Sequence, residues 1–553
     1  MTTERTWWSQ KLSRRYALRG GATLAASIAA ASLLACSSDD SNSGSAEPTP
    51  ESQVSSDAKP GGKMGFVRGG ATANLNPVVD TGQRLDIGGQ IAYDRLVSTR
   101  PGKDYFLENA TSVEFPDNLT VVFKLKPNQF FHNIPPVNGR ALTAEDVVAS
   151  NNYVKEETRA INAIFQRTAM ASATAPDANT VVFKLTSPQP YLFSGGLLVD
   201  PSGSSIFPKE IIGKQDEVQI GSGPYQLSDY QLNTRYQYKR FDKFRDADKK
   251  VPFIDERTWL ILVDNVAQEA AFRSEQISQW RLPESSTTQK QLQSDLGSKV
   301  EVDEYLALQF IGWLGNVTRA PWNDVRVREA VYRLLDRNQH LQLVHEGRGA
   351  VPAGLLPYGQ SDYQLDPKQT EKYFKQDVAA AKQLLNAASF PFDKEFEVSQ
   401  TASARDAQLG QVLQVQFEQA GIKTRVQGYP FAQWLPNKIG KGDYDMYISG
   451  LPAWDAPQIP LRFNHTTTNF AQPFSGLKDP AIDKLIEKSE VTLDKEERVK
   501  LVKDIQLQLM DKYTPYINVY NYKQFIARYA YVRDFIVDPS GNPNSQGQMW
   551  LNA

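Results

Sequence analysis

One stretch in the second half of the chain constrains the fold more than any other. Residues 396–400 (FEVSQ) and 422–429 (IKTRVQGY) have the patterns of short strands, and residues 404–420 have the pattern of a helix that ends at Gly421. A strand–helix–strand unit of this kind places its two strands side by side and parallel. The sequence therefore predicts an α/β fold in this half of the chain.

The first half contains two closely similar strand patterns. Residues 120–127 (TVVFKLKP) alternate between apolar and polar side chains, and residues 179–188 (NTVVFKLTSP) nearly repeat them. We expect a helix between them that begins where Thr143 and Asp146 have the spacing of a capping box. The two strands bracket a predicted subdomain over residues 95–215, and no other internal repeat is evident.

Further elements follow from the same patterns. The apolar spacing predicts a helix over residues 265–280 that closes on Trp280, and a single helix over residues 324–345. Residues 444–451 and 515–532 have the composition and alternation of strands. The chain is therefore expected to return as a strand near its C-terminal end.

The first 36 residues have the organisation of an export signal. Arg14 and Arg15 precede a weakly apolar segment, Gly20–Ala35, which is too short and too rich in alanine to be a comfortable membrane span. The paired arginines resemble a twin-arginine signal, and "LLAC" ending at Cys36 resembles a lipobox, in which the cysteine is lipidated. We predict that residues 1–35 are removed and that Cys36 is a lipid anchor; the alternative is an amphipathic start with a chance cysteine.

Cys36 is the only cysteine, so neither an intramolecular disulfide nor a thiolate metal site is expected. Residues 36–60 are rich in Ser, Pro, Asp and Glu and predict a disordered tether. The full chain has a formal charge of −2, and removal of residues 1–35 leaves 56 basic and 62 acidic residues, a charge of −6. This balance excludes a basic field for nucleic acid, and membrane contact is expected through the lipid alone.

Sequence motifs for catalysis and cofactor binding are missing. The chain has no P-loop pattern, no G-x-G-x-x-G, no H-E-x-x-H and no G-x-S-x-G. Its four histidines do not have the spacing of metal ligands, and Asp443 and Asp445 have the pattern of solvated turn charges. We therefore expect no cofactor, no metal site and no catalytic residue, and a protein that is not an enzyme.

Aromatic residues near turns are abundant and allow two interpretations. Most are expected to pack in the core, but some of them could form the walls of a ligand cleft with few polar groups. The candidates are Tyr225, Trp280, Trp313, Trp322, Trp434, Trp454, Tyr520 and Tyr522.

Taken in order, several motifs resemble the peptide-type solute-binding lipoproteins of ABC importers, extracellular solute-binding family 5. The resemblance extends from residue 61 to about residue 540. The motifs that carry it are "NLNPVVD" (74–80), "AYDRLV" (92–97), "NLTVVFKLKPNQFFHN", "LTAEDVVASNNYV", "GSGPYQLSDY" and "PWNDVRVREAVYRLLDR" (321–337).

This resemblance implies a two-lobed periplasmic-binding-protein-like α/β fold that engulfs its ligand between the lobes. Lobe I would comprise residues 61–305, lobe II residues 306–522, and residues 523–553 would return to lobe I. The two crossings are expected near Tyr305–Ile311 and Tyr516–Tyr522. A monomer that is anchored outside the cytoplasm would deliver its ligand to the permease subunits of an ABC importer.

Peptide binders of this family carry an Ala-Asp-Tyr-x-(Asp/Glu)-Pro run whose first Asp pairs with the peptide amine. Here the corresponding stretch is "GLPAWDAPQIPL" (450–461), in which Trp454 follows Ala453 and Asp455 comes one position late. Asp455 would then either bind the amine or serve as a turn residue, in which case Trp454 offers a stacking face for an uncharged ligand. The expected ligand-binding residues are Asn74, Leu75, Asn76, Tyr225, Trp280, Trp313, Trp434, Trp454, Asp455 and Tyr520.

Three classes of function remain open at this point. The leading hypothesis is a binding component of an ABC importer that takes a dipeptide or oligopeptide, with an oligosaccharide or another uncharged solute as the alternative. The second is a secreted hydrolase with paired carboxylates, for which the sequence offers no nucleophile with a base partner. The third is a structural or signalling surface protein built on the same lobes.

Overall fold

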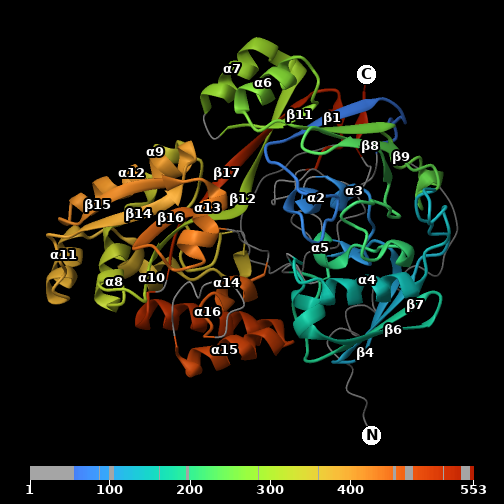
Figure 1. The fold of residues 1–553 in the computed structure, drawn as a ribbon. Coiled ribbons are helices and arrows are strands. Elements are labelled where there is room, and N and C mark those ends of the chain that lie inside the picture. The colour runs from blue at the N-terminus through green and yellow to red at the C-terminus, as the bar shows by residue number, and fades with distance from the viewer. Residues whose placement is uncertain are drawn as a thin grey trace, which may run out of the picture.

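A computed structural model describes residues 55–85, 87–98, 105–160, 162–194, 198–283, 286–358, 360–451, 456–466, 478–514, 516–536 and 549–552. These residues form an α/β protein of two lobes joined by a pair of long strands (Figure 1). In these ranges no helix is both long and apolar enough to cross a bilayer. Arg14, Arg15 and Cys36 lie outside the described residues.

Lobe I is built on a four-stranded sheet in which one strand pair is parallel and two are antiparallel. Phe66 and Trp259 are register partners in the parallel pair, and their rings stack at 4.4 Å between centroids. Short helices complete this core on the side that faces the subdomain (Figure 1). The elements are β1 (Lys63–Arg68), β10 (Glu256–Ile261), β9 (Arg235–Arg240), β8 (Tyr225–Gln231), α2 (Thr81–Leu85) and α3 (Gly88–Ile91).

A second four-stranded sheet forms the predicted subdomain, with α4 (Ala144–Glu156) packed against it. The predicted capping box of α4 is confirmed, because the Asp146 carboxylate accepts a hydrogen bond from the Thr143 backbone N–H at 2.9 Å. The sheet order is β4 (Ala110–Asp117), β5 (Thr120–Leu125), β7 (Thr180–Leu185) and β6 (Met170–Asp177).

The likeness between residues 120–127 and 179–188 extends to whole hairpins. The two hairpins share one register, including the irregularity before the turn. At their junction Lys124 Nζ donates to Thr180 Oγ1 at 2.7 Å, and Lys184 Nζ donates to Thr120 Oγ1 at 2.6 Å. The sequence conceals this repeat because β4 and β6 expose many side chains, which are free to differ.

A mixed sheet, most of which lies in lobe II, has the order β11 (Gln279–Arg281), β17 (Ile517–Tyr529), β12 (Val300–Gly315), β16 (Met446–Leu451), β14 (Glu395–Thr401) and β15 (Lys423–Tyr429). The predicted parallel pair is confirmed: β14 runs parallel to β15, with α12 (Ala404–Glu418) between them in sequence, and β14 also runs parallel to β16. The short strand β13 (Gly349–Ala350) pairs with β17.

Helices cover both faces of this sheet (Figure 1). Helices α9 (Arg337–His345) and α12 lie on one face, whereas α8 (Val325–Leu334), α10 (Pro367–Phe374) and α11 (Val378–Ala387) lie on the other. The remaining α-helices of four or more residues within the described ranges are α5 (Pro201–Ser204), α6 (Asn265–Arg273), α7 (Ser286–Leu296), α14 (Gln458–Arg462), α15 (Pro480–Val491) and α16 (Lys495–Lys512).

Strands β12 and β17 pair antiparallel and run from one lobe to the other (Figure 1). Their pairing is interrupted between Leu306 and Phe310, where β12 carries extra residues. There Asn521 Nδ2 donates to the carbonyls of Ala307 and Gln309 at 3.4 and 3.1 Å. The Asn521 side chain thus replaces main-chain pairing at the crossing, while the lobe boundaries at residues 305 and 522 stay predictions.

Two predicted helices differ from the structure. Residues 324–345 form α8 and α9 instead of one helix, because Leu335 is extended and Asp336 caps the second helix by accepting from the Gln339 N–H at 2.9 Å. Helix α6 ends at Arg273, and Trp280 belongs to β11, where it is the register partner of Ala527. In both places the apolar residues keep a helical spacing, but the helix itself ends within the segment.

Candidate ligand-binding site

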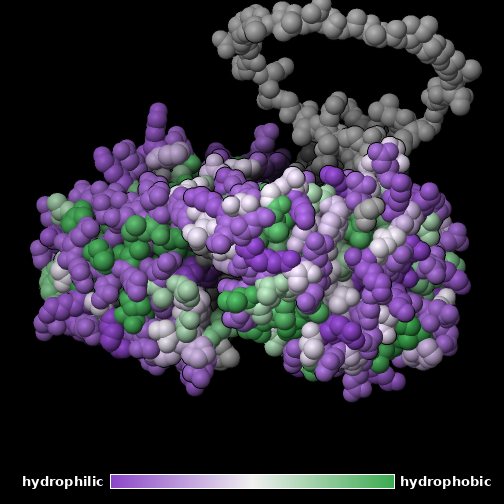
Figure 2. Space-filling view, turned by 90° about the horizontal axis from the view of Figure 1, so that it is seen from above, coloured by the Kyte–Doolittle hydropathy of each residue, from purple (hydrophilic) through white to green (hydrophobic). Residues whose placement is uncertain are grey.

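The parallel strands of lobe II end at one edge of their sheet. Thr401, Tyr429 and Leu451 are the last residues of β14, β15 and β16. Ligands of α/β proteins bind outside this carboxyl edge, where loops can converge. The helices α13 (Phe431–Gln433) and α14 lie on the side of lobe II that faces lobe I (Figure 1). We take this edge, on the side where the surface is recessed between the two lobes (Figure 2), as the candidate site.

Asp406, in the first turn of α12, organises this edge. Its carboxylate is fully buried and accepts hydrogen bonds from the Thr401 hydroxyl, from Ser449 Oγ at 3.1 Å and from Arg405 Nε at 3.0 Å. A buried carboxylate is tolerated only when several donors surround it. Asp406 therefore fixes both the end of β14 and the direction of the Arg405 side chain.

Arg405 connects this edge to the crossing strands. Its Nη1 atom donates to the Tyr522 hydroxyl at 3.2 Å, and that hydroxyl donates to Gln309 Oε1 at 2.9 Å. Tyr522 belongs to β17 and Gln309 to β12, so one chain of hydrogen bonds joins α12 to both crossings. The candidate site and the crossing strands are thereby joined through neighbouring side chains.

His345 packs against Tyr522 and is not suited to carry a proton. The two rings stack at 4.4 Å, and Tyr520 meets the imidazole edge-on at 5.4 Å. Burial, together with the nearby charges of Arg405 and Arg348, lowers the pKa of His345 to about 3. The imidazole is therefore neutral near neutral pH and serves as a packing surface. Among the described residues no group of three or more His, Cys, Asp or Glu has the arrangement of a metal site.

The expected early loop of lobe I is only partly accessible. Asn74 is half-buried, whereas Leu75 lies in the core of lobe I. Asn76 is fully buried, and its Nδ2 atom donates to Asp216 Oδ1 at 2.9 Å and to Tyr153 Oη at 2.8 Å. Leu75 and Asn76 thus hold the loop in place, and Asn74 is the one of the three with a partly exposed side chain.

Most of the expected cleft aromatics are core residues, which corrects their interpretation as cleft walls. Tyr225 packs under the Arg257 guanidinium at 4.3 Å from its ring centroid, and Trp280 Nε1 donates to Gln268 Oε1 at 2.9 Å. Trp313 is fully buried in the core of lobe II. Burying such a large ring stabilises the folded protein more than leaving it exposed, so these rings lie in the core unless a cleft interrupts the packing.

Trp434 and Tyr520 are buried too, but they lie near the candidate site. Tyr520 is on crossing strand β17, and Trp434 follows α13 at the carboxyl edge of β15. Beside Trp434, the side chains of Phe431 and Leu435 are 62% and 46% exposed. Trp454 and Asp455 lie outside the described residues, so their expected roles stay predictions.

Sequence reasoning did not identify Arg405, Asp406, Gln309 or Ser449. A signal for two of them exists, because Ser403 and Asp406 have the S-x-x-D spacing of a helix start directly after a strand. Ser403 does cap α12, with its hydroxyl accepting from the Asp406 N–H at 3.2 Å. Gln309 and Ser449 carry no such local signal, since only the folded sheet brings them to this edge.

Comparison with known proteins gives one family and one fold. Residues 107–471 match the family described as "Bacterial extracellular solute-binding proteins, family 5 Middle". The dipeptide-binding protein of Escherichia coli K12 is 23% identical over 508 residues, which are 85% of this chain and 91% of that protein.

Two solved structures share the fold with low sequence identity. The oligopeptide-binding protein AppA of Bacillus subtilis, in complex with a nonapeptide, superposes with a TM-score of 0.73 at 20% identity and covers 90% of this chain and 100% of its own. The binding protein AgaA of A. tumefaciens R10, in complex with agropinic acid, has a TM-score of 0.73 at 22% identity and covers 89% and 99%. These likenesses establish a two-lobed binding-protein fold.

Proposed function

Because this chain belongs to the bacterial extracellular solute-binding proteins of family 5, we propose that it is the peptide-capturing component of an ABC importer. It binds a dipeptide or oligopeptide between its lobes and presents the closed form to the permease. The observation that carries this proposal is the hydrogen-bond chain from Asp406 through Arg405 to Tyr522 and Gln309. It joins the carboxyl edge of lobe II to both crossing strands.

Capture requires that the ligand favours the closed arrangement over the open one. A solute that contacts both lobes binds the closed form more tightly, and the population shifts by that difference in affinity. The crossing strands suit such a movement, because their ladder is already interrupted at residues 307–309 and completed there by the Asn521 side chain.

A peptide ligand is supported by the E. coli relative, which is named a dipeptide-binding protein and aligns over most of both chains. The runner-up ligand is an oligosaccharide or another non-peptide solute. Two observations favour it: the stretch "AWDAP" departs from the family's peptide-binding run, and AgaA holds agropinic acid in the same fold.

We place the protein outside the cytoplasm, held to the membrane by a lipid on Cys36 after export through the twin-arginine signal at Arg14 and Arg15. The support for this is the sequence order of paired arginines, apolar segment and "LLAC". A monomer without catalytic activity suffices for this role, with the ligand, the permease subunits and the membrane as its partners.

A thermal-shift screen tests the proposal directly. Neutral dipeptides to octapeptides and a panel of oligosaccharides are added to the purified protein, and hits are confirmed by calorimetry. A ligand present at 100 times its dissociation constant adds about 2.7 kcal/mol to the free energy of unfolding, which gives a clear shift. We expect peptides to stabilise the protein. Stabilisation by oligosaccharides alone would favour the runner-up ligand, and stabilisation by neither would refute a role in capturing either class.

A further inference from the structure

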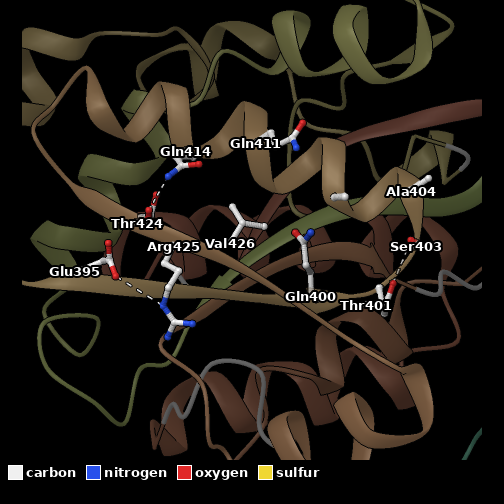
Figure 3. Close-up of a pocket in the computed structure, with 13 residues that line it drawn as sticks. Glu395, Gln400, Thr401, Ser403, Ala404, Gln411, Gln414, Thr424, Arg425 and Val426 are labelled. Carbon is white, nitrogen blue, oxygen red and sulfur yellow. Dashed lines mark hydrogen bonds and ion pairs between the residues drawn. The ribbon is translucent and has the colours of Figure 1, made fainter.

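A groove with a volume of about 750 Å³ opens on lobe II between α12 and the strands β14 and β15 (Figure 3). We call it the α12 groove. One end is formed by Thr401–Ala404, at the carboxyl edge of β14, directly beside Arg405 and Asp406. The other end is formed by Glu395 and Arg425, which pair at 3.7 Å. The groove therefore begins at the candidate ligand site and leads away from the crossing strands.

Small side chains create the groove. Ala404 and Ala407 are one turn apart on the flank of α12, and Gly428 lies on β15. Larger side chains at these positions would fill the angle between the helix and the sheet. Gln411 and Gln414 continue the same flank of the helix along the groove. The space is thus lined by a regular row of residues and has a direction parallel to α12.

Two buried polar atoms line this groove without a hydrogen-bond partner: Gln400 Oε1 and Thr424 Oγ1. Gln400 is 1% exposed and Thr424 is 5% exposed. The Gln400 amide points from β14 toward α12 (Figure 3). A buried polar atom without a partner is costly to the folded state, and both oxygens can accept a hydrogen bond from a molecule that lies in the groove.

The lining is neutral along most of its length. Its polar groups are carboxamides and hydroxyls, and charge enters only at the far end with Glu395 and Arg425. A carboxamide has one donor group and one acceptor, which matches the N–H and C=O of a peptide unit. None of the residues that line the groove is aromatic, so the flat stacking face that suits a sugar ring is missing from it.

We propose that the α12 groove binds the backbone of the distal part of an oligopeptide whose first residues occupy the interlobe site. This inference rests on the proposed function and specifies the ligand as longer than the interlobe site alone can hold. From Ala404 to Gln414 the helix rises by about 15 Å, at 1.5 Å per residue. An extended peptide covers that distance with about five residues. The groove would thus add affinity that depends on peptide length and little on side chains.

The test compares a tripeptide with an octapeptide, both of alternating alanine and serine, by calorimetry on the full protein. We expect the octapeptide to bind the wild type about tenfold tighter than the tripeptide does. Gln400→Leu and Gln411→Ala should each weaken octapeptide binding about fivefold and leave tripeptide binding within about twofold. Gln408→Ala is the matched control, because Gln408 is exposed on α12 but does not line the groove.

A stability measurement separates a binding role of Gln400 from a structural one. Because its Oε1 atom has no partner, Gln400→Leu should keep or raise the melting temperature while it lowers octapeptide affinity. Unchanged octapeptide affinity in both groove variants, or equal binding of the two peptides to the wild type, would overturn the inference alone. Failure of both peptides to bind the wild type would overturn the proposed function, and this inference with it.

Discussion

One guanidinium joins parts of the chain that lie far apart in sequence. Arg405 is held by the adjacent carboxylate of Asp406 and reaches Tyr522, 117 positions further along the chain. Arginine suits this position because its planar fork makes several hydrogen bonds in fixed directions. At the scale of single residues, the candidate site and the crossing are therefore one connected structure.

The stretch "AWDAP" separates the two ligand classes. If the ligand is a peptide whose ammonium group meets Asp455 in the closed cleft, Asp455→Asn should cost about 2–5 kcal/mol of affinity, because it leaves a desolvated charge unpaired. Trp454→Ala should then cost less. If the ligand is uncharged, Asp455→Asn should cost about 1 kcal/mol and Trp454→Ala should be the more damaging change. Calorimetry with a ligand from the screen checks this, and two unaffected variants would show that this stretch does not line the site.

A second prediction at this scale concerns pH. The pKa of His345 is about 3 in the folded protein and about 6.5 in the unfolded chain. The unfolded state therefore binds the proton more readily. The free energy of unfolding is unaffected by His345 above pH 6.5, and it decreases as the pH falls from 6.5 toward 3. At pH 5 this loss amounts to about 2 kcal/mol.

We expect His345→Phe to remove most of that loss, because phenylalanine still stacks on Tyr522 but does not titrate. Urea unfolding at pH 7 and pH 5 measures the change. Comparison of the variant with the wild type cancels the other titrating groups, including His132 and His340, whose pKa values burial also lowers. An equal loss of stability in both proteins would contradict the assignment.

Among the elements, α8 and α16 are joined through a single buried arginine. The Arg328 guanidinium donates to the carbonyl of Tyr513 at 2.9 and 2.7 Å, to that of Thr514 at 3.2 Å and to that of Trp322 at 2.7 Å. Tyr513 and Thr514 follow the last residue of α16, Lys512, and precede β17. Arg328 thereby satisfies helix-end carbonyls that would otherwise lack donors and sets where the second crossing begins.

We predict that Arg328→Lys lowers the free energy of unfolding by about 3 kcal/mol, because an ammonium group cannot reach three carbonyls in different directions. The matched control is Arg326→Lys on the same helix, where the exposed pair with Asp324 should make little difference to stability. Chemical denaturation measures both. Equal effects of the two substitutions would mean that the buried Arg328 guanidinium stabilises the fold no more than an exposed one does.

At the scale of the whole molecule, the two lobes and their interrupted crossing ladder predict an open ligand-free form and a closed bound form. Small-angle scattering should give a smaller radius of gyration when a saturating ligand from the screen is added. The control is the same protein with a non-binding compound of similar size. A tight ligand that leaves the radius unchanged would refute closure for this protein.

Cellular location is also a property of the whole chain. We predict that Cys36→Ser moves the protein from the membrane fraction to the soluble fraction or blocks signal processing, because the lipid attachment atom is lost. Replacement of Arg14 and Arg15 by lysine should leave precursor inside the cell. Fractionation with immunoblotting measures both, and an unchanged membrane fraction of the Cys36 variant would exclude the lipid anchor.

Features that depend on neighbours along the chain could be predicted from the sequence alone. The strand–helix–strand unit of β14, α12 and β15 follows from side-chain periodicity, and the capping box of Thr143 and Asp146 follows from spacing. The break at Asp336 between α8 and α9 is also local, but the helical apolar spacing on both sides concealed it. The family resemblance likewise depends on short motifs in their order, and it supplied the two-lobed fold.

The set of side chains at the candidate site could not be predicted from the sequence, because it depends on contacts between distant segments. Trp280 and Trp313 are indistinguishable from cleft residues in the sequence, yet both are buried because sheets and helices from distant segments close over them. Arg405, Tyr522 and Gln309 meet because β17 and β12 pair within the sheet whose parallel strands lead to α12. Sequence periodicity shows which face of a helix or strand is apolar. The element that packs on that face is set by the order of strands in the sheet and by contacts between distant segments.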